Sequence, residues 1–179
     1  MSDTERDDWS GSLFEQLVQG GVKLFAHVPD AGIAGLIQLA EQHNEVRSVL
    51  LGGAAGSFVG PDRLDLPLTL EDTREAGLSL GSGVVMVFGH EDDMVDTVRR
   101  IAEFFRDESC GQCVPCRVGT VRQEEVLVRL RRGATLDDER ELLDDLGAVM
   151  RDASICGLGQ TAAGAVRSAL DLGLLEGAR

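Results

Sequence analysis

The segment ESCGQCVPCRVGT, residues 108–120, holds three of the four cysteines of this chain: Cys110, Cys113 and Cys116. The fourth, Cys156, follows in SICGLGQ, residues 154–160. Three thiolates, each separated by two residues, can occupy three corners of an iron–sulfur cubane, and one distant cysteine can complete the fourth corner. We therefore expect all four cysteines to bind one [4Fe–4S] cluster.

Two other interpretations use the same cysteines. A structural zinc site also takes four thiolates, but such sites usually combine two separated Cys-x-x-Cys pairs. Disulfides are the other alternative, since four cysteines allow three pairings. The acidic first residues do not resemble a secretory signal, and 179 residues can build a core without disulfides. The spacing favours the cluster, while a zinc-stabilised interaction module and disulfides stay as alternatives.

The charge balance limits the classes of partner. The formal net charge is −14, from 17 basic and 31 acidic residues, which argues against nucleic acid as the main partner. No apolar run approaches the roughly 18 residues that cross a bilayer, so no membrane insertion is expected. Reduced cysteines are typical of a cytoplasmic protein, and we expect that location.

Apolar residues recur at helical spacing from residue 91 onward, which predicts a four-helix domain over residues 91–179. The predicted inward positions are Met94, Val95, Val98, Ile101, Ala102 and Phe105, then Val121, Val126, Leu127 and Leu130, then Leu142, Leu143, Leu146, Val149 and Met150, and finally Ala162, Ala165, Val166, Ala169 and Leu170. The last helix is expected over about 160–174. All four cysteines fall in or beside the first and third connections, so antiparallel packing would bring them to one end.

The preceding residues predict strands. Residues 1–10 form an acidic tail in this interpretation, and residues 11–51 form a helix followed by a β-α-β unit. Its strands lie at 22–28 and 46–51 around a helix over about 31–43, which suggests parallel strands with a right-handed crossover. Residues 52–90 are expected to be a small, mostly extended β-rich module with a strand at 84–88. The predicted fold class is α+β.

Residues from about 52 to 179 resemble the C-terminal part of the NADH-binding, flavin-containing subunit of respiratory complex I, and of related NAD-linked formate dehydrogenase and hydrogenase diaphorase subunits. The matching segments are GGAAGSFVG, LDLPLTLEDTREAGLSLGSGVVMVF, ESCGQCVPCRVGT and SICGLGQTAAGAVRSAL. The resemblance implies that Cys110, Cys113, Cys116 and Cys156 hold a [4Fe–4S] cluster in a four-helix domain. In that family the cluster relays single electrons from reduced flavin toward further iron–sulfur centres.

The flavin and NADH site of the family has no counterpart in the sequence. A GRGGAGFP-like flavin loop is missing, and the glycines of GGAAGSF, residues 52–58, are interpreted as a tight turn rather than a phosphate site. Neither FMN nor NAD is therefore expected on this chain, and no residue is assigned a catalytic role. We expect a non-autonomous electron-transfer subunit of a multisubunit, NAD(H)-linked oxidoreductase, whose partner subunits carry flavin or further iron–sulfur clusters.

A second likeness covers residues of about 12–50, which resemble the N-terminal segment of thiamine-diphosphate-dependent 2-oxoacid decarboxylases. In those enzymes the second strand leads to a glutamate that activates the cofactor. Here the strand continues into Leu50-Leu51-Gly52-Gly53 instead. We favour a docking or capping role for this segment, because a lone β-α-β unit cannot bury both faces of its strands. A component of a thiamine-dependent decarboxylase or oxidoreductase stays as the alternative.

Overall fold

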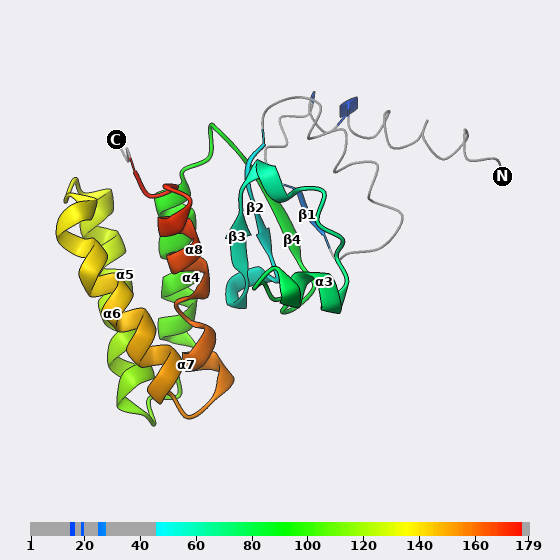
Figure 1. Ribbon diagram of the computed structural model, residues 1–179. Coiled ribbons are helices and arrows are strands. Elements are labelled where there is room, and N and C mark those ends of the chain that lie inside the picture. The colour runs from blue at the N-terminus through cyan, green and yellow to red at the C-terminus, as the bar shows by residue number, and fades with distance from the viewer. Residues whose placement is uncertain (1–14, 17–18, 20–24, 28–45, 177–179) are drawn as a thin grey trace.

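The computed structural model describes residues 15–16, 19, 25–27 and 46–176. A small sheet and a bundle of helices lie side by side (Figure 1), which confirms the α+β class. The predicted acidic tail, residues 1–10, and the predicted helix over about 31–43 lie outside the described residues.

The sheet has four strands in the order β1-β4-β2-β3. Their bounds are Phe25–His27 for β1, Val46–Leu51 for β2, Ser57–Val59 for β3 and Val85–Gly89 for β4. Every pairing is antiparallel. The two strands of the predicted β-α-β unit therefore run in the same direction, but they are not neighbours because β4 pairs with both. The sheet takes strands from both sides of residue 52, and a domain boundary there stays a prediction.

Both faces of the sheet are covered. Along β2 and its neighbours, alternate side chains point to opposite faces. Leu50, Phe58 and Phe88 pack against the helices, where the rings of Phe58 and Phe88 lie 5.6 Å apart. The opposite face forms a second apolar cluster, whose buried members are Val49, Leu51, Val59 and Val85. Strand β2 is therefore buried on both faces, which explains the continuous apolar sequence at its end, Val49-Leu50-Leu51.

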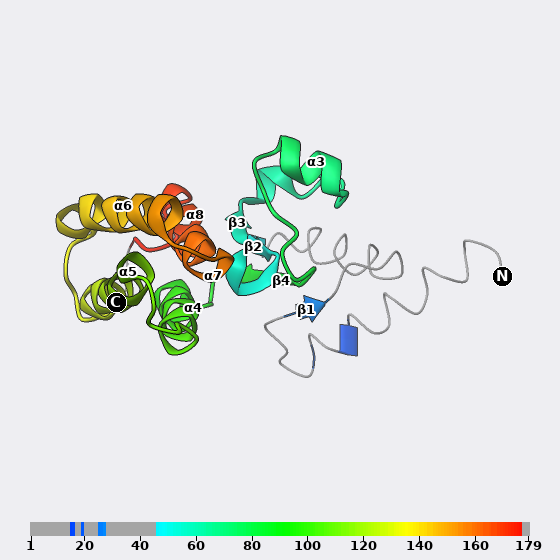
Figure 2. The same cartoon turned by 90° about the horizontal axis from the view of Figure 1, so that it is seen from below.

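The segment between β3 and β4 covers the sheet face away from the bundle. Leu64, Leu68 and Leu78 pack on the second cluster, and this segment carries α3 (Leu70–Glu75), beyond the sheet from α4 and α8 in Figure 2. The prediction of a mostly extended module is wrong at α3. Its N-terminus is capped by Thr69, whose side chain accepts a hydrogen bond from the Asp72 N–H at 3.0 Å. A Thr-x-x-Asp pattern is a known helix start, so the sequence carried this signal.

The glycine-rich segment after β2 makes a tight turn, as predicted. It contains a short 3-10 helix, η1 (Gly53–Ala55), and a second one, η2 (Pro61–Arg63), follows β3. Gly52 and Gly53 have φ of 89° and 69°, in the left-handed region that favours glycine. A Cβ atom at Gly52 would lie 2.7 Å from the carbonyl oxygen of Ser79. Because Gly52 has no side chain, its backbone can contact the backbone of the loop that contains Ser79.

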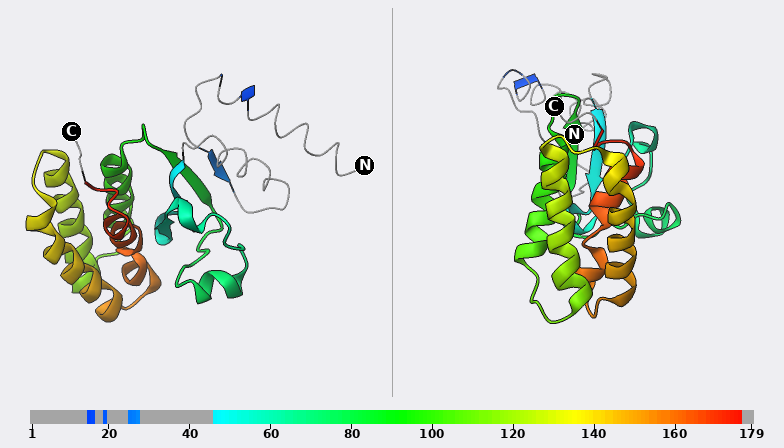
Figure 3. Two further views of the ribbon diagram at one scale, coloured as in Figure 1. Left: turned by 45° about the horizontal axis from the view of Figure 1, so that its top comes forward. Right: turned by 90° about the vertical axis from the view of Figure 1, so that its left-hand side faces the viewer.

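Four longer helices and one short helix form the bundle (Figure 3). Their bounds are Met94–Asp107 for α4, Val114–Arg131 for α5, Leu136–Ala153 for α6, Gly157–Thr161 for α7 and Gly164–Asp171 for α8. α4 and α8 lie next to the sheet, and α5 and α6 lie farther from it (Figure 1). Within the described ranges, no helix is both long and apolar enough to cross a bilayer.

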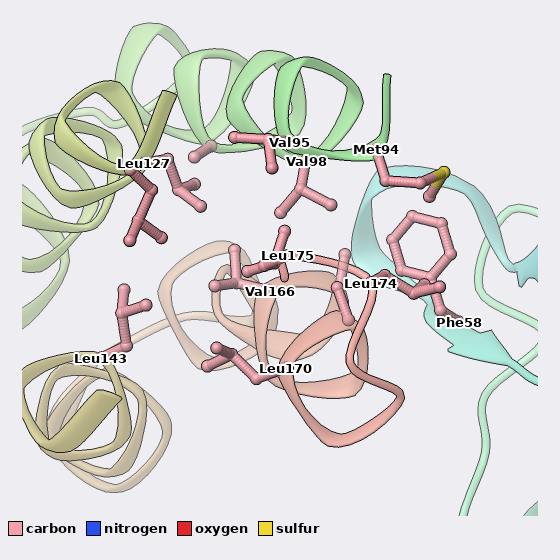
Figure 4. Packing of buried hydrophobic residues seen from close by; sticks show 14 of the residues in the cluster. Phe58, Met94, Val95, Val98, Leu127, Leu143, Val166, Leu170, Leu174 and Leu175 are labelled. Carbon is pink, nitrogen blue, oxygen red and sulfur yellow. The ribbon is translucent and has the colours of Figure 1, made fainter. Parts of the chain in front are cut away.

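The bundle core follows most of the predicted positions. Figure 4 shows side chains from α4, α5, α6 and α8 meeting one another and Phe58 of the sheet. Three predicted inward residues are instead exposed at the surface: Val121, Leu142 and Val149. Leu142 and Val149 are two turns apart on α6 and share a face, whereas the buried face contains Leu143 and Met150. The apolar spacing in α5 and α6 therefore predicted wider buried faces than these helices have in the bundle.

The last predicted helix is interrupted after Thr161. The buried side chain of Gln123, on α5, donates a hydrogen bond from Nε2 to the carbonyl oxygen of Ala162 at 3.0 Å. This bond satisfies a backbone group that the interruption leaves without a helical partner. The chain therefore turns between α7 and α8. Cys156 is the N-cap of α7, the shorter of these two helices.

Candidate metal centre

The four cysteines lie at one end of the bundle, the lower end in Figure 1, where α4 joins α5 and α6 joins α7. Cys110 is in the α4–α5 connection, Cys113 is the N-cap of α5, Cys116 is in its first turn, and Cys156 is the N-cap of α7. All four line one cavity of about 120 Å³, together with Glu108, Ser109, Gln112 and Leu158. The predicted convergence of the cysteines is therefore present in the fold.

Exposure differs among the four thiols. Cys116 is buried, Cys113 is half-buried, and Cys110 and Cys156 are exposed. All four are free thiols rather than disulfides. The cavity therefore has an inner side against the helices and an outer side that opens to the surface.

The ligand geometries of a single zinc ion and of an iron–sulfur cluster differ. Zinc binds thiolates at about 2.3 Å, so the sulfurs of one zinc site lie within about 4 Å of one another. In the part of the chain that the structure describes, no three His, Cys, Asp or Glu side chains form such a group. In a [4Fe–4S] cluster each thiolate binds a different iron, and the sulfurs stay farther apart. Four thiols around one cavity supply the donor set that a [4Fe–4S] cluster uses.

Two glycines shape the walls of the cavity. Gly111 has φ of 75°, a left-handed conformation that turns the chain between the first two cysteines. Gly159 lets α7 approach α5 closely, since a Cβ atom there would lie 2.9 Å from Cβ of Cys116 and 2.4 Å from Oγ of Ser154. At Gly157, by contrast, an added Cβ meets nothing within 4 Å. Packing therefore makes Gly159, and not Gly157, the constrained position in α7.

Backbone N–H groups lower the pKa of the Cys113 thiol below its ordinary value. The largest cause is the N–H of Ile155, followed by the N–H of Cys116, with a smaller effect of the Ser154 side chain. These groups favour the thiolate, which is the form that binds metal. Because Ile155 precedes Cys156, this interaction also joins the segment of the fourth cysteine to that of the first three.

Ser109 and Arg117 complete the surroundings of the first three cysteines. The Ser109 hydroxyl lies 3.3 Å from Sγ of Cys116. Arg117 donates a hydrogen bond from Nη1 to the carbonyl oxygen of Gly111 at 3.2 Å. This hydrogen bond joins the first turn of α5 to the loop between the first two cysteines. Ser109, Ser154 and Gly159 were missed by sequence reasoning, because contacts between distant segments leave no local pattern.

Comparisons with known proteins agree with this geometry. Residues 96–172 match the family described as the NADH-ubiquinone oxidoreductase-F iron-sulfur binding region. In Aquifex aeolicus, the F subunit of NADH-quinone oxidoreductase is 35% identical over 128 residues, covering 72% of this chain and 29% of the relative. The NADP-reducing hydrogenase subunit HndC of Solidesulfovibrio fructosivorans is 32% identical over 125 residues, covering 70% and 26%. The chain thus spans about a quarter of the length of these relatives.

A solved structure has a similar fold. The H2-reduced form of an NAD+-reducing [NiFe]-hydrogenase superposes with a TM-score of 0.64 at 31% identity, covering 75% of this chain and 24% of that chain. The resemblance to flavin-subunit iron–sulfur domains is confirmed, and the family match supports a [4Fe–4S] cofactor. The thiamine-enzyme likeness concerns residues 12–50, most of which lie outside the described residues, and stays a prediction.

Proposed function

We propose that Cys110, Cys113, Cys116 and Cys156 bind one [4Fe–4S] cluster and that this chain transfers single electrons within a larger, NAD(H)-linked oxidoreductase. The observation that carries the proposal is the shared cavity: four thiols from two connections, far apart in sequence, line one space at one end of the bundle. When bound, such a cluster accepts and releases one electron with little structural change.

The protein contributes an environment suited to an anionic group. Cys113, Cys116 and Cys156 lie at the N-termini of α5 and α7, where the first N–H groups have no helical partner. The Ile155 N–H faces Cys113. Helices on the inner side keep Cys116 from solvent, while the exposed Cys110 and Cys156 leave an outer edge open. Electrons can therefore enter or leave at the surface of the chain.

Apolar side chains beside the ligands support a partner protein at this edge. Val114 and Val118 are 59% and 44% exposed, and Ile155 is 78% exposed. Each lies next to, or within two residues of, a proposed ligand. Apolar groups at such a surface are stabilised when a partner covers them. This supports electron donors and acceptors on other chains.

The flavin and NADH sites are proposed to lie outside this chain. The relatives are named as subunits of NADH-quinone oxidoreductase and of an NADP-reducing hydrogenase, and each is several times longer than the matched region. The sequence contains no flavin loop like that of the family. The chain would act as the iron–sulfur part of such a complex, joined to partners that carry flavin or further clusters.

Anaerobic purification with metal and sulfide analysis tests the cluster. About four irons and four sulfides per chain are expected, with an EPR signal that appears on reduction. Cys156→Ala should lose most of this iron and signal. Ile155→Ala, at the exposed neighbouring position, is the matched control and should keep the iron. Stoichiometric zinc without iron, or a full cluster in Cys156→Ala, would contradict the proposal.

Co-purification tests the partner. The chain carrying an affinity tag, isolated anaerobically from its native cell, should retain a flavin-containing or iron–sulfur partner. The complex should reduce a dye with NADH or NADPH, and the isolated chain should not. NADH oxidation by the isolated chain would place the flavin site on this polypeptide and contradict that part of the proposal.

A further inference from the structure

Two serine hydroxyls lie near the proposed ligand sulfurs, and each can donate a hydrogen bond. Ser109 Oγ is 3.3 Å from Sγ of Cys116 and accepts a hydrogen bond from the Gly111 N–H at 3.4 Å. A cysteine that binds iron is a thiolate and has no proton to donate. In the cluster-bound protein, the hydrogen bond between Ser109 and Cys116 must therefore be donated by the serine.

Ser154 reaches the same site from the other connection. It is 6% exposed, and its backbone is fully used: its N–H donates to Met150, and its carbonyl accepts from Gln160 Nε2 at 3.1 Å. Its hydroxyl is one of three buried side-chain oxygens without a hydrogen-bond partner among the described residues. A buried hydroxyl without a partner is unfavourable, so its presence points to a group that it would meet.

The position of this hydroxyl identifies the group. The Cβ position of Gly159 lies 2.4 Å from Ser154 Oγ and 2.9 Å from Cβ of Cys116, so the hydroxyl is packed between α7 and the cysteine loop. The Ser154 side chain also contributes to the lowered pKa of Cys113. The Cys113 sulfur is therefore an acceptor near this hydroxyl, and it becomes a stronger acceptor when it carries the charge of a cluster.

We propose that Ser109 and Ser154 donate hydrogen bonds to the cysteine sulfurs of the cluster and so raise its reduction potential. This inference rests on the proposed function, since it requires the cluster. Reduction adds one electron to the cluster and transfers no proton, so both O–H bonds stay intact. The added electron increases negative charge on the sulfurs, and a hydrogen-bond donor stabilises that reduced state more than the oxidised one.

Redox titrations of the purified protein, followed by EPR, test this role. Ser109→Ala and Ser154→Ala should each lower the midpoint potential, and the double variant should lower it further. Ser79→Ala is the matched control, because its hydroxyl accepts only a turn N–H from Gly81, away from the cysteines. Its potential should equal that of the wild type. Ser109→Thr keeps the hydroxyl, so its midpoint potential should equal that of the wild type.

Each outcome decides one of the two proposals. Unchanged potentials in both alanine variants, with a full cluster, would overturn this inference and leave the proposed function intact. A wild-type protein that assembles no cluster would overturn the proposed function itself. Ser109 lies in a connection rather than in a helix, so Ser109→Ala is expected to fold and carries the test even where Ser154→Ala binds less iron.

Thermal unfolding of the metal-free protein separates potential tuning from simple structural support. Without a cluster, Ser154→Ala should unfold near the wild-type temperature, because no hydrogen bond of normal geometry joins this buried hydroxyl to another described residue. A clear loss of stability in the metal-free Ser154→Ala, with no change in potential in the loaded form, would assign the hydroxyl to folding and contradict the inference.

Discussion

The two ends of the helical bundle are held together by different interactions. At the end away from the cysteines, Arg129 Nη2 lies 2.8 Å from Oε2 of Glu139, and Arg131 Nη1 lies 2.7 Å from Oδ1 of Asp96. Leu130 packs beneath these ion pairs in the main apolar core. At the cysteine end, thiols, backbone amides and a close helix contact at Gly159 surround an open cavity. Ion pairs and apolar side chains fill the end away from the cysteines, whereas the cysteine end contains the cavity that is proposed to bind a cluster.

Removing the cluster should have the largest effect on stability and should act at the cysteine end. In the proposed function, four bonds from iron to cysteine join α5 to the start of α7, so their loss should lower the free energy of unfolding by roughly several kcal/mol. Thermal unfolding of the anaerobic protein before and after chelation measures this. Equal unfolding temperatures would mean that the cysteine end is already held by the polypeptide alone.

Gly159→Ala should have the next largest effect. The new Cβ atom would lie 2.6 Å from Cβ of Ser154 and 2.9 Å from that of Cys116, so α7 must move away from α5. We expect a loss of about 1–3 kcal/mol in stability and a lower iron content. Gly157→Ala is the matched control: its Cβ meets open space, and it should keep the cluster. Equal iron content in both variants would contradict the close contact.

Glu139→Gln at the opposite end should cost less and should leave the cluster intact. It breaks the ion pair between Arg129, whose side chain is 45% exposed, and Glu139, whose side chain is 11% exposed. The amide keeps one acceptor oxygen for Arg129, so the expected loss is about 1 kcal/mol. Denaturant unfolding measures this loss, and iron analysis measures the cluster. Glu125→Gln removes a more exposed pair with Arg122 on α5 and serves as the control. Iron loss in Glu139→Gln would show that the two ends are coupled.

Asp152→Asn should have the smallest effect, near the cysteine end of α6. The hydrogen bond from Arg151 lowers the pKa of the Asp152 carboxyl. A lowered pKa gives stability that is present above the unfolded value of about 3.9 and is lost as pH falls through the folded value. Asp152 is exposed, so the variant should unfold only slightly earlier at neutral pH. The difference should vanish in acid; a difference that grew on acidification would contradict this sign.

Much of the site could be predicted because its main features are local. Cysteine spacing places Cys110, Cys113 and Cys116 in one loop whatever the rest of the fold does. Apolar periodicity indicates the helices, and short connections make neighbouring helices antiparallel, which brings Cys156 to the same end. The α3 helix was missed although Thr69 and Asp72 gave a start signal, because residues 52–90 were interpreted as mostly extended.

The remaining features could not be predicted because they depend on which distant segments meet. Nothing near Val85 in sequence indicates that β4 lies between β1 and β2. No local pattern marks Gly159 as the position where α7 approaches Cys116, or Ser154 as the hydroxyl packed against that position. The exposed positions of Leu142 and Val149 likewise follow from the rotation of α6 in the bundle, which its own sequence does not define.

The sequence by itself determined the chemistry available to this chain: four thiols, their spacing, and helices in the order that gathers them. The tertiary structure decided the strand order, the helix contact at Gly159 and the N–H and O–H groups that face the sulfurs. The physical reason is the distance along the sequence between the residues that interact. Spacing and periodicity act between residues a few positions apart, whereas hydrogen bonding and close packing around the cavity join Ser109 and Ser154 from opposite connections.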